Sequence, residues 1–169
     1  MALSYKELMP QIRNFIFDVD GVLTDGKLHV TGDGQLLRQM NAKDGFALKI
    51  ALEKGYKICI ITGGNDPGVK KRFQELGVTD IYMNAWHKLE AFDEYCDIYD
   101  LKKEEICYMG DDLPDLPVMN EVGLSAAPCD ADHQVQQNAA YISRSKGGEG
   151  CVRDIIEQIM RVQGTWPKY

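Results

Sequence analysis

Short apolar runs alternate with longer amphipathic segments along most of the chain. A short continuous apolar run is typical of a buried strand, whereas apolar positions three and four residues apart predict a helix. Strands are predicted at residues 14–17, 57–62, 81–83, 106–109, 124–127 and 141–143. Helices are predicted between and after them at residues 45–54, 66–77, 87–99, 113–122, 130–140 and 149–162. This alternation favours an α/β fold, a Rossmann-like open parallel sheet with helices on both faces.

One segment after the first strand departs from that alternation. Two short extended runs, residues 27–30 and 35–40, flank a glycine-rich turn at residues 31–34. This arrangement is typical of two antiparallel strands joined by a tight turn. We therefore expect a small β-hairpin flap over about residues 27–40, next to the end of the first strand.

Length, charge and composition set the broad class of the protein. A chain of 169 residues with 44% hydrophobic content can bury one core, so we expect a single domain over residues 1–169, with a C-terminal helix and tail over about 149–169. The net charge of −7 argues against general binding to nucleic acid or to an anionic membrane. Neither a signal peptide nor an apolar run long enough to span a membrane is evident, so we expect a cytoplasmic protein. The five cysteines form no CxxC pair, which suggests neither a disulfide framework nor a zinc site.

Two carboxylates follow the first predicted strand. Asp18 and Asp20 are separated by one residue, and alternate side chains of an extended segment point the same way. Two carboxylates at such a short separation repel each other unless a cation or a shared proton lies between them. A hard divalent ion such as Mg²⁺ suits a site made of oxygen ligands.

Further polar residues follow the other predicted strands, and ligands of open α/β sheets bind outside the carboxyl ends of the strands. They are Thr62, Lys88, Asp111 and Asp112. An aspartate in such a place is more often a helix cap, but joint placement at successive strand ends favours a common site. Asp115 is open to two interpretations, as a support for Lys88 or the waters of the metal, or as an ordinary helix-start residue.

Such a set suits cleavage of a phosphate monoester. An ionised Asp18 could attack phosphorus, and Asp20 could protonate the leaving oxygen and then activate water. Lys88 and Mg²⁺ would neutralise the phosphoryl oxygens, and the Thr62 hydroxyl with the backbone of Gly63 would hold them. Asp111 would supply a further carboxylate for the metal.

Four motifs in order resemble those of the haloacid dehalogenase superfamily of phosphatases: DVDGVLTDG, ITGG, the lysine of AWHKLEAF, and GDDLPD. The resemblance implies catalytic roles for Asp18 as nucleophile, Asp20 as acid and base, and Thr62 and Lys88 as phosphate binders. It also implies that Asp18, the backbone carbonyl of Asp20, and Asp111 bind Mg²⁺. Because only the flap and one helix separate the first two motifs, the chain resembles the capless subgroup and has no cap domain.

Within that subgroup, DVDGVLTDG, NAKDGFALK and GGEGCVRD make the chain similar to phosphatases of 3-deoxy-D-manno-octulosonate (KDO) 8-phosphate, which serve lipopolysaccharide biosynthesis. This resemblance implies a phosphorylated sugar acid as substrate, and a homotetramer whose neighbouring subunits complete each active site. The implied substrate-binding residues are Asp20, Asn41, Ala42, Lys43, Asp44, Gly45, Lys49, Thr62, Gly63, Arg72 and Lys88. Cations at positions 43, 49 and 72 suit a substrate that carries a carboxylate and a phosphate.

Some alternatives stay open at this point. After the ITG motif this chain has Gly64. Many relatives carry arginine at this position, and relatives that act on nine-carbon sugar phosphates carry glutamate. A phosphatase of a nine-carbon keto-sugar acid phosphate (KDN-9-phosphate or N-acylneuraminate-9-phosphate) is therefore an alternative. Asp20 argues against a phospho-acceptor receiver domain, and the complete set of motif residues argues against a non-catalytic oligomerisation module. The glycine-rich loop at 147–150 either lets the C-terminal segment reach an active site or is a simple helix-entry loop. A tail containing Trp166, Pro167 and Tyr169 either docks on a neighbouring subunit or is disordered.

Overall fold

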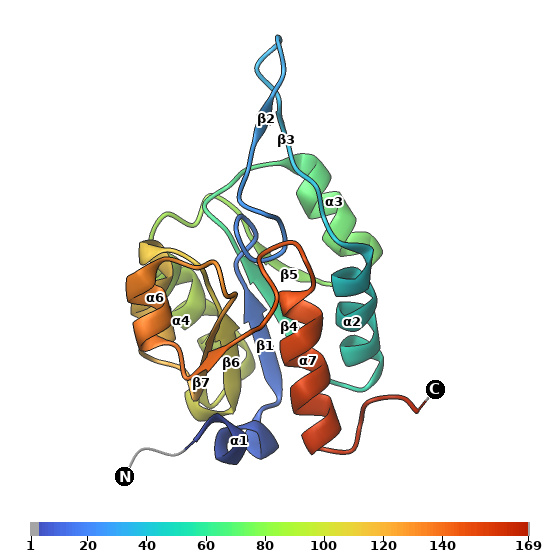
Figure 1. The fold of residues 1–169 in the computed structure, drawn as a ribbon, viewed down its shortest axis with the longest axis vertical. Helices are drawn as coiled ribbons and strands as arrows, with labels where there is room; N and C mark the ends of the chain where they lie inside the picture. Colours follow the sequence, from blue (N-terminus) through green and yellow to red (C-terminus); the bar gives the residue numbers. More distant parts are fainter. Residues whose placement is uncertain (1–3, 169) are drawn as a thin grey trace.

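Six parallel strands form the centre of the molecule, in the order β5-β4-β1-β6-β7-β8 (Figure 1). The structure is a computed structural model and describes residues 4–168. The strands are β1 (Asn14–Phe17), β4 (Lys57–Ile61), β5 (Asp80–Tyr82), β6 (Ile106–Met109), β7 (Leu124–Ala127) and β8 (Tyr141–Ile142). The chain places β4 and β5 on one side of β1 and β6 to β8 on the other. The strand order therefore reverses at β1, and a crevice is expected at the carboxyl ends of β1, β4 and β6.

Helices cover both faces of the sheet. One face packs against α1 (Tyr5–Leu8), α2 (Ala42–Glu53), α3 (Pro67–Glu75) and α7 (Cys151–Val162), and the other against α4 (Lys88–Tyr99), α5 (Leu116–Met119) and α6 (His133–Asn138). Successive residues of β1 alternate between the faces, with Phe15 and Phe17 in one apolar cluster and Ile16 in the other. Three short 3₁₀ segments complete the helical structure, at Met9–Gln11, Lys103–Glu105 and Leu113–Asp115. The predicted α/β sheet with helices on both faces is confirmed.

The hairpin predicted over residues 27–40 is present as β2 (His29–Val30) and β3 (Leu36–Leu37), which pair antiparallel. It projects from the end of the molecule where the strands terminate (Figure 1). All four strand residues are exposed. A hairpin with strands this short has little stability of its own, so contacts with the core must hold it.

Three predicted helices differ from the observed ones by three or more residues at one end. The helix expected over residues 130–140 is the shorter α6. The helix expected to start at residue 45 starts at Ala42, because the Asn41 side chain accepts a hydrogen bond from the backbone N–H of Lys43 at 2.9 Å and caps the helix. The helix expected over residues 113–122 is a 3₁₀ turn followed by α5, which has only four residues. Pro114 and Pro117 lack the N–H groups that a longer regular helix would need.

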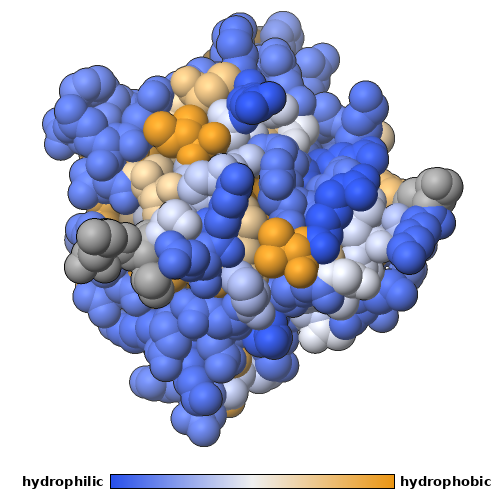
Figure 2. Space-filling view, turned by 60° about the horizontal axis from the view of Figure 1, so that its bottom comes forward, coloured by the Kyte–Doolittle hydropathy of each residue, from blue (hydrophilic) through white to orange (hydrophobic). Residues whose placement is uncertain are grey.

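The end of the molecule opposite the hairpin is mostly hydrophilic, and its apolar side chains lie in small separate patches (Figure 2). Four exposed apolar side chains gather on the hairpin: Leu28, Val30, Leu36 and Leu37. Within residues 4–168, no helix combines the length and the apolar character needed to cross a membrane.

The chain end packs on its own core up to Trp166. The Trp166 side chain belongs to the cluster beneath α2 and α7, and the guanidinium carbon of Arg153 lies 5.7 Å from the centre of its ring. Trp166 therefore packs on the core of its own chain, which differs from both expectations for the tail, docking on a neighbouring subunit or disorder. Tyr169 lies outside the described residues.

Candidate active site

An open cleft of about 1190 Å³ lies at the carboxyl ends of β1, β4 and β6. Its lining combines these strand ends with the hairpin and the start of α4. The sequence-predicted residues in the lining are Asp18, Asp20, Thr62, Gly63, Lys88 and Asp111. The fold thus brings residues from four separate segments of the chain to one cleft.

Lys88 ties two of the carboxylates together. It is the first residue of α4, and its Nζ lies 2.9 Å from Asp18 Oδ1 and 2.7 Å from Asp115 Oδ1. Burial alone would lower the pKa of Lys88, but the charges of Asp18 and Asp115 outweigh it and raise the pKa above the ordinary value. Lys88 is therefore a fixed, buried cation beside Asp18.

Asp115 holds Lys88 in place and is itself held by four donors. Its Oδ1 accepts from Lys88 Nζ and, at 2.5 Å, from the Tyr108 hydroxyl. Its Oδ2 accepts from the backbone N–H groups of Asp111 at 3.0 Å and Asp112 at 3.2 Å. Of the two interpretations left open by the sequence, these contacts support the one in which Asp115 anchors Lys88. Tyr108 was missed, because it lies in an apolar strand and nothing in the sequence indicates where its hydroxyl points.

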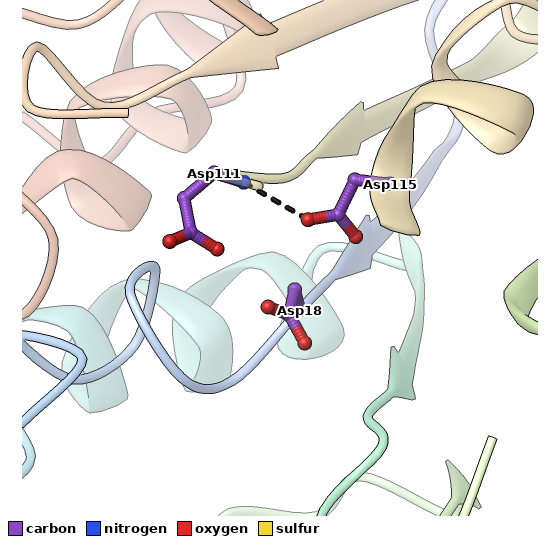
Figure 3. A group of neighbouring side chains, drawn as sticks. All are labelled: Asp18, Asp111 and Asp115. Carbon is purple, nitrogen blue, oxygen red and sulfur yellow. Dashed lines mark hydrogen bonds between the residues drawn. The ribbon is translucent and has the colours of Figure 1, made fainter. Parts of the chain in front are cut away.

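Asp18, Asp111 and Asp115 converge on one space, where an oxygen of each lies within 4.8 Å of the others (Figure 3). Burial and the charge of Asp115 raise the pKa of Asp18 to about 6, and burial and the charge of Asp18 raise the pKa of Asp111 to about 8. Asp111 Oδ1 is buried without a hydrogen-bond partner. A divalent cation would relieve both the repulsion and the unpaired oxygen, so these residues fit a metal site. Since the Asp115 oxygens already have donors, Asp18 and Asp111 are the carboxylates best suited to hold the ion.

The segment after β1, residues 18–26, is termed here the catalytic loop, and it lies against Asp111. A Cβ at Gly21 would lie 1.9 Å from Asp111 Oδ2, and Gly21 has φ +94°. Only glycine permits this approach and this backbone conformation. On its other side, the loop rests on the glycine-rich segment before α7, where a Cβ at Gly147 would lie 1.9 Å from the carbonyl oxygen of Gly21. The catalytic loop is therefore clamped between β6 and the start of α7.

The Asp20 side chain contacts the hairpin. Its carboxylate is bound by Arg38, whose Nε lies 2.6 Å from Oδ1 and whose Nη2 lies 3.0 Å from Oδ2. Arg38 also donates from Nη1 to Asp66 Oδ2 at 3.2 Å. Arg38 was not identified from the sequence, although the position of Arg38 within the predicted flap indicated that its side chain could reach the end of the first strand.

Thr62 follows β4 and is buried. Its hydroxyl accepts a hydrogen bond from the backbone N–H of Gly64 at 3.1 Å, and its carbonyl accepts from the N–H of Ala85 at 2.9 Å. These bonds fix the turn that carries Gly63 and Gly64 along the edge of the cleft.

The remaining residues of the predicted substrate-binding set do not line the cleft of this single chain. Asn41, Ala42, Lys43, Asp44, Gly45 and Lys49 cap or belong to α2, and Arg72 belongs to α3. Gly45 and Arg72 lie together, since a Cβ at Gly45 would be 3.0 Å from Arg72 Nη2. Asp44 is buried and accepts from the backbone N–H of Arg153 at 2.8 Å, so it ties α2 to the start of α7. The sugar-binding role of this set stays a prediction.

Comparison with known proteins places this site in a family. A family model of haloacid dehalogenase-like hydrolases matches residues 77–155. The KDO 8-phosphate phosphatase of Escherichia coli (strain K12) is 39% identical over 153 residues, which cover 90% of this chain and 81% of that protein.

Solved structures agree with this placement. The KDO 8-phosphate phosphatase from Yersinia pestis has a TM-score of 0.93 at 35% identity, over 95% of this chain and 87% of that chain. The enzyme from Moraxella catarrhalis, in complex with a magnesium ion, a phosphate ion and a KDO molecule, has a TM-score of 0.91 at 30% identity, over 95% of this chain and 92% of that chain. This chain belongs to the haloacid dehalogenase superfamily and, within it, to the family of KDO 8-phosphate phosphatases.

Proposed function

We propose that this chain hydrolyses 3-deoxy-D-manno-octulosonate 8-phosphate to KDO and inorganic phosphate, and that it uses Mg²⁺. The observation that carries the proposal is the contact of 2.9 Å between Lys88 Nζ and Asp18 Oδ1, at the edge of a group of carboxylates that fits a divalent ion. It joins a carboxylate nucleophile to charges that can neutralise phosphoryl oxygens. The relatives named for this substrate support the choice of sugar.

The first chemical step is attack of an Asp18 carboxylate oxygen on phosphorus, which breaks the bond to the sugar oxygen and forms an aspartyl-phosphate. Asp20 gives its proton to the departing sugar oxygen. In the second step, Asp20 takes a proton from water, which attacks phosphorus and releases phosphate from Asp18. The two residues lie on the same loop. Lys88 contacts Asp18 whereas Arg38 contacts Asp20, which suits their unequal roles.

The phosphoryl oxygens gain charge in both steps. Lys88 offers them a buried ammonium, and the Thr62 hydroxyl with the backbone N–H of Gly63 offers hydrogen-bond donors. Mg²⁺ held by Asp18 and Asp111, with the backbone carbonyl of Asp20, would add positive charge at the same oxygens.

A phosphate-release assay across sugar-acid phosphates, with and without EDTA, tests this proposal. We expect turnover of KDO 8-phosphate above that of KDN-9-phosphate and N-acylneuraminate-9-phosphate, and loss of turnover in EDTA. The Asp18→Asn variant should lose activity by more than about 10³-fold, because no other group in the site replaces the nucleophile. Near-normal turnover by this variant would refute the nucleophile assignment, and faster turnover of a nine-carbon substrate would refute the choice of sugar.

We further propose that the enzyme is a homotetramer in which the hairpins meet. The exposed Leu28, Val30, Leu36 and Leu37 support an interface at the hairpin, since apolar side chains gathered on a projection are typical of contact surfaces. Analytical ultracentrifugation of the wild type and of Val30→Asp tests it, and a wild-type monomer would refute it. The cytoplasmic location stays a prediction from the sequence.

A further inference from the structure

The side chain of Arg38 is embedded in the active-site cleft although its backbone belongs to the projecting hairpin. Only 7% of the side chain is exposed. Its partners are Asp20 on the catalytic loop and Asp66, which also caps the start of α3 through its other oxygen. The two carboxylates fix the orientation of the buried guanidinium, because Arg presents its donors in a rigid planar fork.

The guanidinium lines the active-site cleft beside the turn after β4. A Cβ at Gly64 would lie 3.3 Å from Arg38 Nη2, 3.4 Å from Thr62 Oγ1 and 3.6 Å from Asp20 Oδ2. An arginine nitrogen, a hydroxyl and a carboxylate therefore come together around Gly64 at the edge of the cleft. Two of these three groups belong to the predicted phosphate-handling set.

Arg38 has a donor left for a ligand in the cleft. A guanidinium carries five N–H groups, one on Nε and two on each Nη nitrogen. Nε is used by Asp20, and Nη1 donates to Asp66 and to the carbonyl oxygen of Leu36 at 3.3 Å. Nη2 makes one bond, to Asp20, and it is the Arg38 nitrogen nearest to Gly64.

We propose that Arg38 of the hairpin binds the phosphoryl group of the substrate through Nη2, in the cleft beside Gly64. This inference rests on the proposed phosphatase function and assigns a further binding residue to it. The hairpin thereby contributes a charge to the reaction centre of its own subunit. A phosphoryl group held by Arg38 lies beside Asp20, because both bind the same guanidinium.

Binding of inorganic phosphate in the presence of Mg²⁺, measured by isothermal titration calorimetry, tests the proposal without any sugar substrate. Loss of a charge-assisted hydrogen bond predicts that Arg38→Gln binds phosphate at least about tenfold more weakly. The matched control is Arg161→Gln, which removes an arginine whose side chain is 63% exposed on α7 and should leave the affinity unchanged. Equal affinities of Arg38→Gln and Arg161→Gln would overturn the proposal.

Moving the arginine separates a phosphate contact from mere anchoring of the hairpin. In Arg38→Ala/Gly64→Arg, the new side chain starts next to the position vacated by Arg38, and we expect most of the phosphate affinity to return. Gly64→Arg alone should gain nothing, because Arg38 Nη2 already lies 3.3 Å from the position of the new Cβ. If Arg38→Gln weakens binding and the double variant does not restore it, Arg38 acts only as an anchor and the proposal fails.

These outcomes are distinct from failure of the proposed function. A wild-type protein that releases no phosphate from any sugar-acid phosphate would refute the function. The phosphate affinities of the Arg38 variants would still decide whether this residue binds the anion.

Discussion

Replacing Asp115 with asparagine removes one negative charge from the centre of the active-site network and keeps the shape of the side chain. The amide can adopt two orientations. In one orientation the NH₂ takes the place of Oδ2 and faces the backbone N–H groups of Asp111 and Asp112. These two part-buried donors then lose their acceptor. With its NH₂ in the place of Oδ1, it faces Lys88, while the Tyr108 hydroxyl can rotate and accept.

The second orientation costs less, because it leaves only Lys88 without this partner. Lys88 keeps its contact with Asp18, so its charge is still paired on one side. Loss of one hydrogen bond between charged groups, together with partial loss of a buried ion pair, gives an expected decrease in unfolding free energy of about 2–4 kcal/mol. Phosphate turnover should fall as well, because Lys88 is no longer held from both sides.

Urea unfolding of Asp115→Asn in EDTA, followed by tryptophan fluorescence, measures this decrease. The matched control is Asp112→Asn, in which an exposed cap that accepts from Leu113 N–H at 2.8 Å is replaced by an equally good cap. The control should stay within about 0.5 kcal/mol of the wild type. If Asp115→Asn is as stable as Asp112→Asn, the buried network does not hold Lys88 as described.

Three further predictions address the acid and base, the metal and the catalytic loop. Asp20→Asn should slow turnover of the sugar phosphate by roughly 10²–10⁴-fold in steady-state kinetics, and an unchanged rate would remove Asp20 from proton transfer. In metal-free protein the pKa of Asp18 is raised to about 6 and the pKa of Asp111 to about 8. Between about pH 4 and these values, the folded state therefore binds more protons than the unfolded chain. Stability without metal should therefore fall as pH rises from about 5 to 8, and Mg²⁺ should raise the melting temperature more at pH 8 than at pH 5; an equal rise at both would contradict the site. Gly147→Ala should lower the unfolding free energy by about 1–3 kcal/mol because its Cβ meets a carbonyl oxygen of the catalytic loop, whereas Gly32→Ala, with open space around it, should leave stability unchanged in urea unfolding.

The agreement between sequence and structure is best where a local pattern carries the information. Continuous apolar runs predict β1, β4 and β6 within one residue, because strands buried on both faces need apolar side chains at every position. The boundaries of the helices agree less well. The early start of α2 depends on the Asn41 cap, and the shortness of α5 depends on two prolines.

The sequence by itself determined that Asp18, Thr62 and Asp111 follow buried strands. Because parallel strands end at the same edge of a sheet, the sequence also predicted that these residues share one cleft. The tertiary structure alone decided which side chains touch them. Arg38 reaches Asp20 from the hairpin, and Tyr108 reaches Asp115 from within the sheet. No local periodicity encodes such contacts, because they depend on the angle at which the hairpin leaves the sheet and on the face of β6 that meets α4 and the turn before α5. Periodicity fixes which face of an element is buried, whereas the partners on that face are fixed only when distant segments pack together.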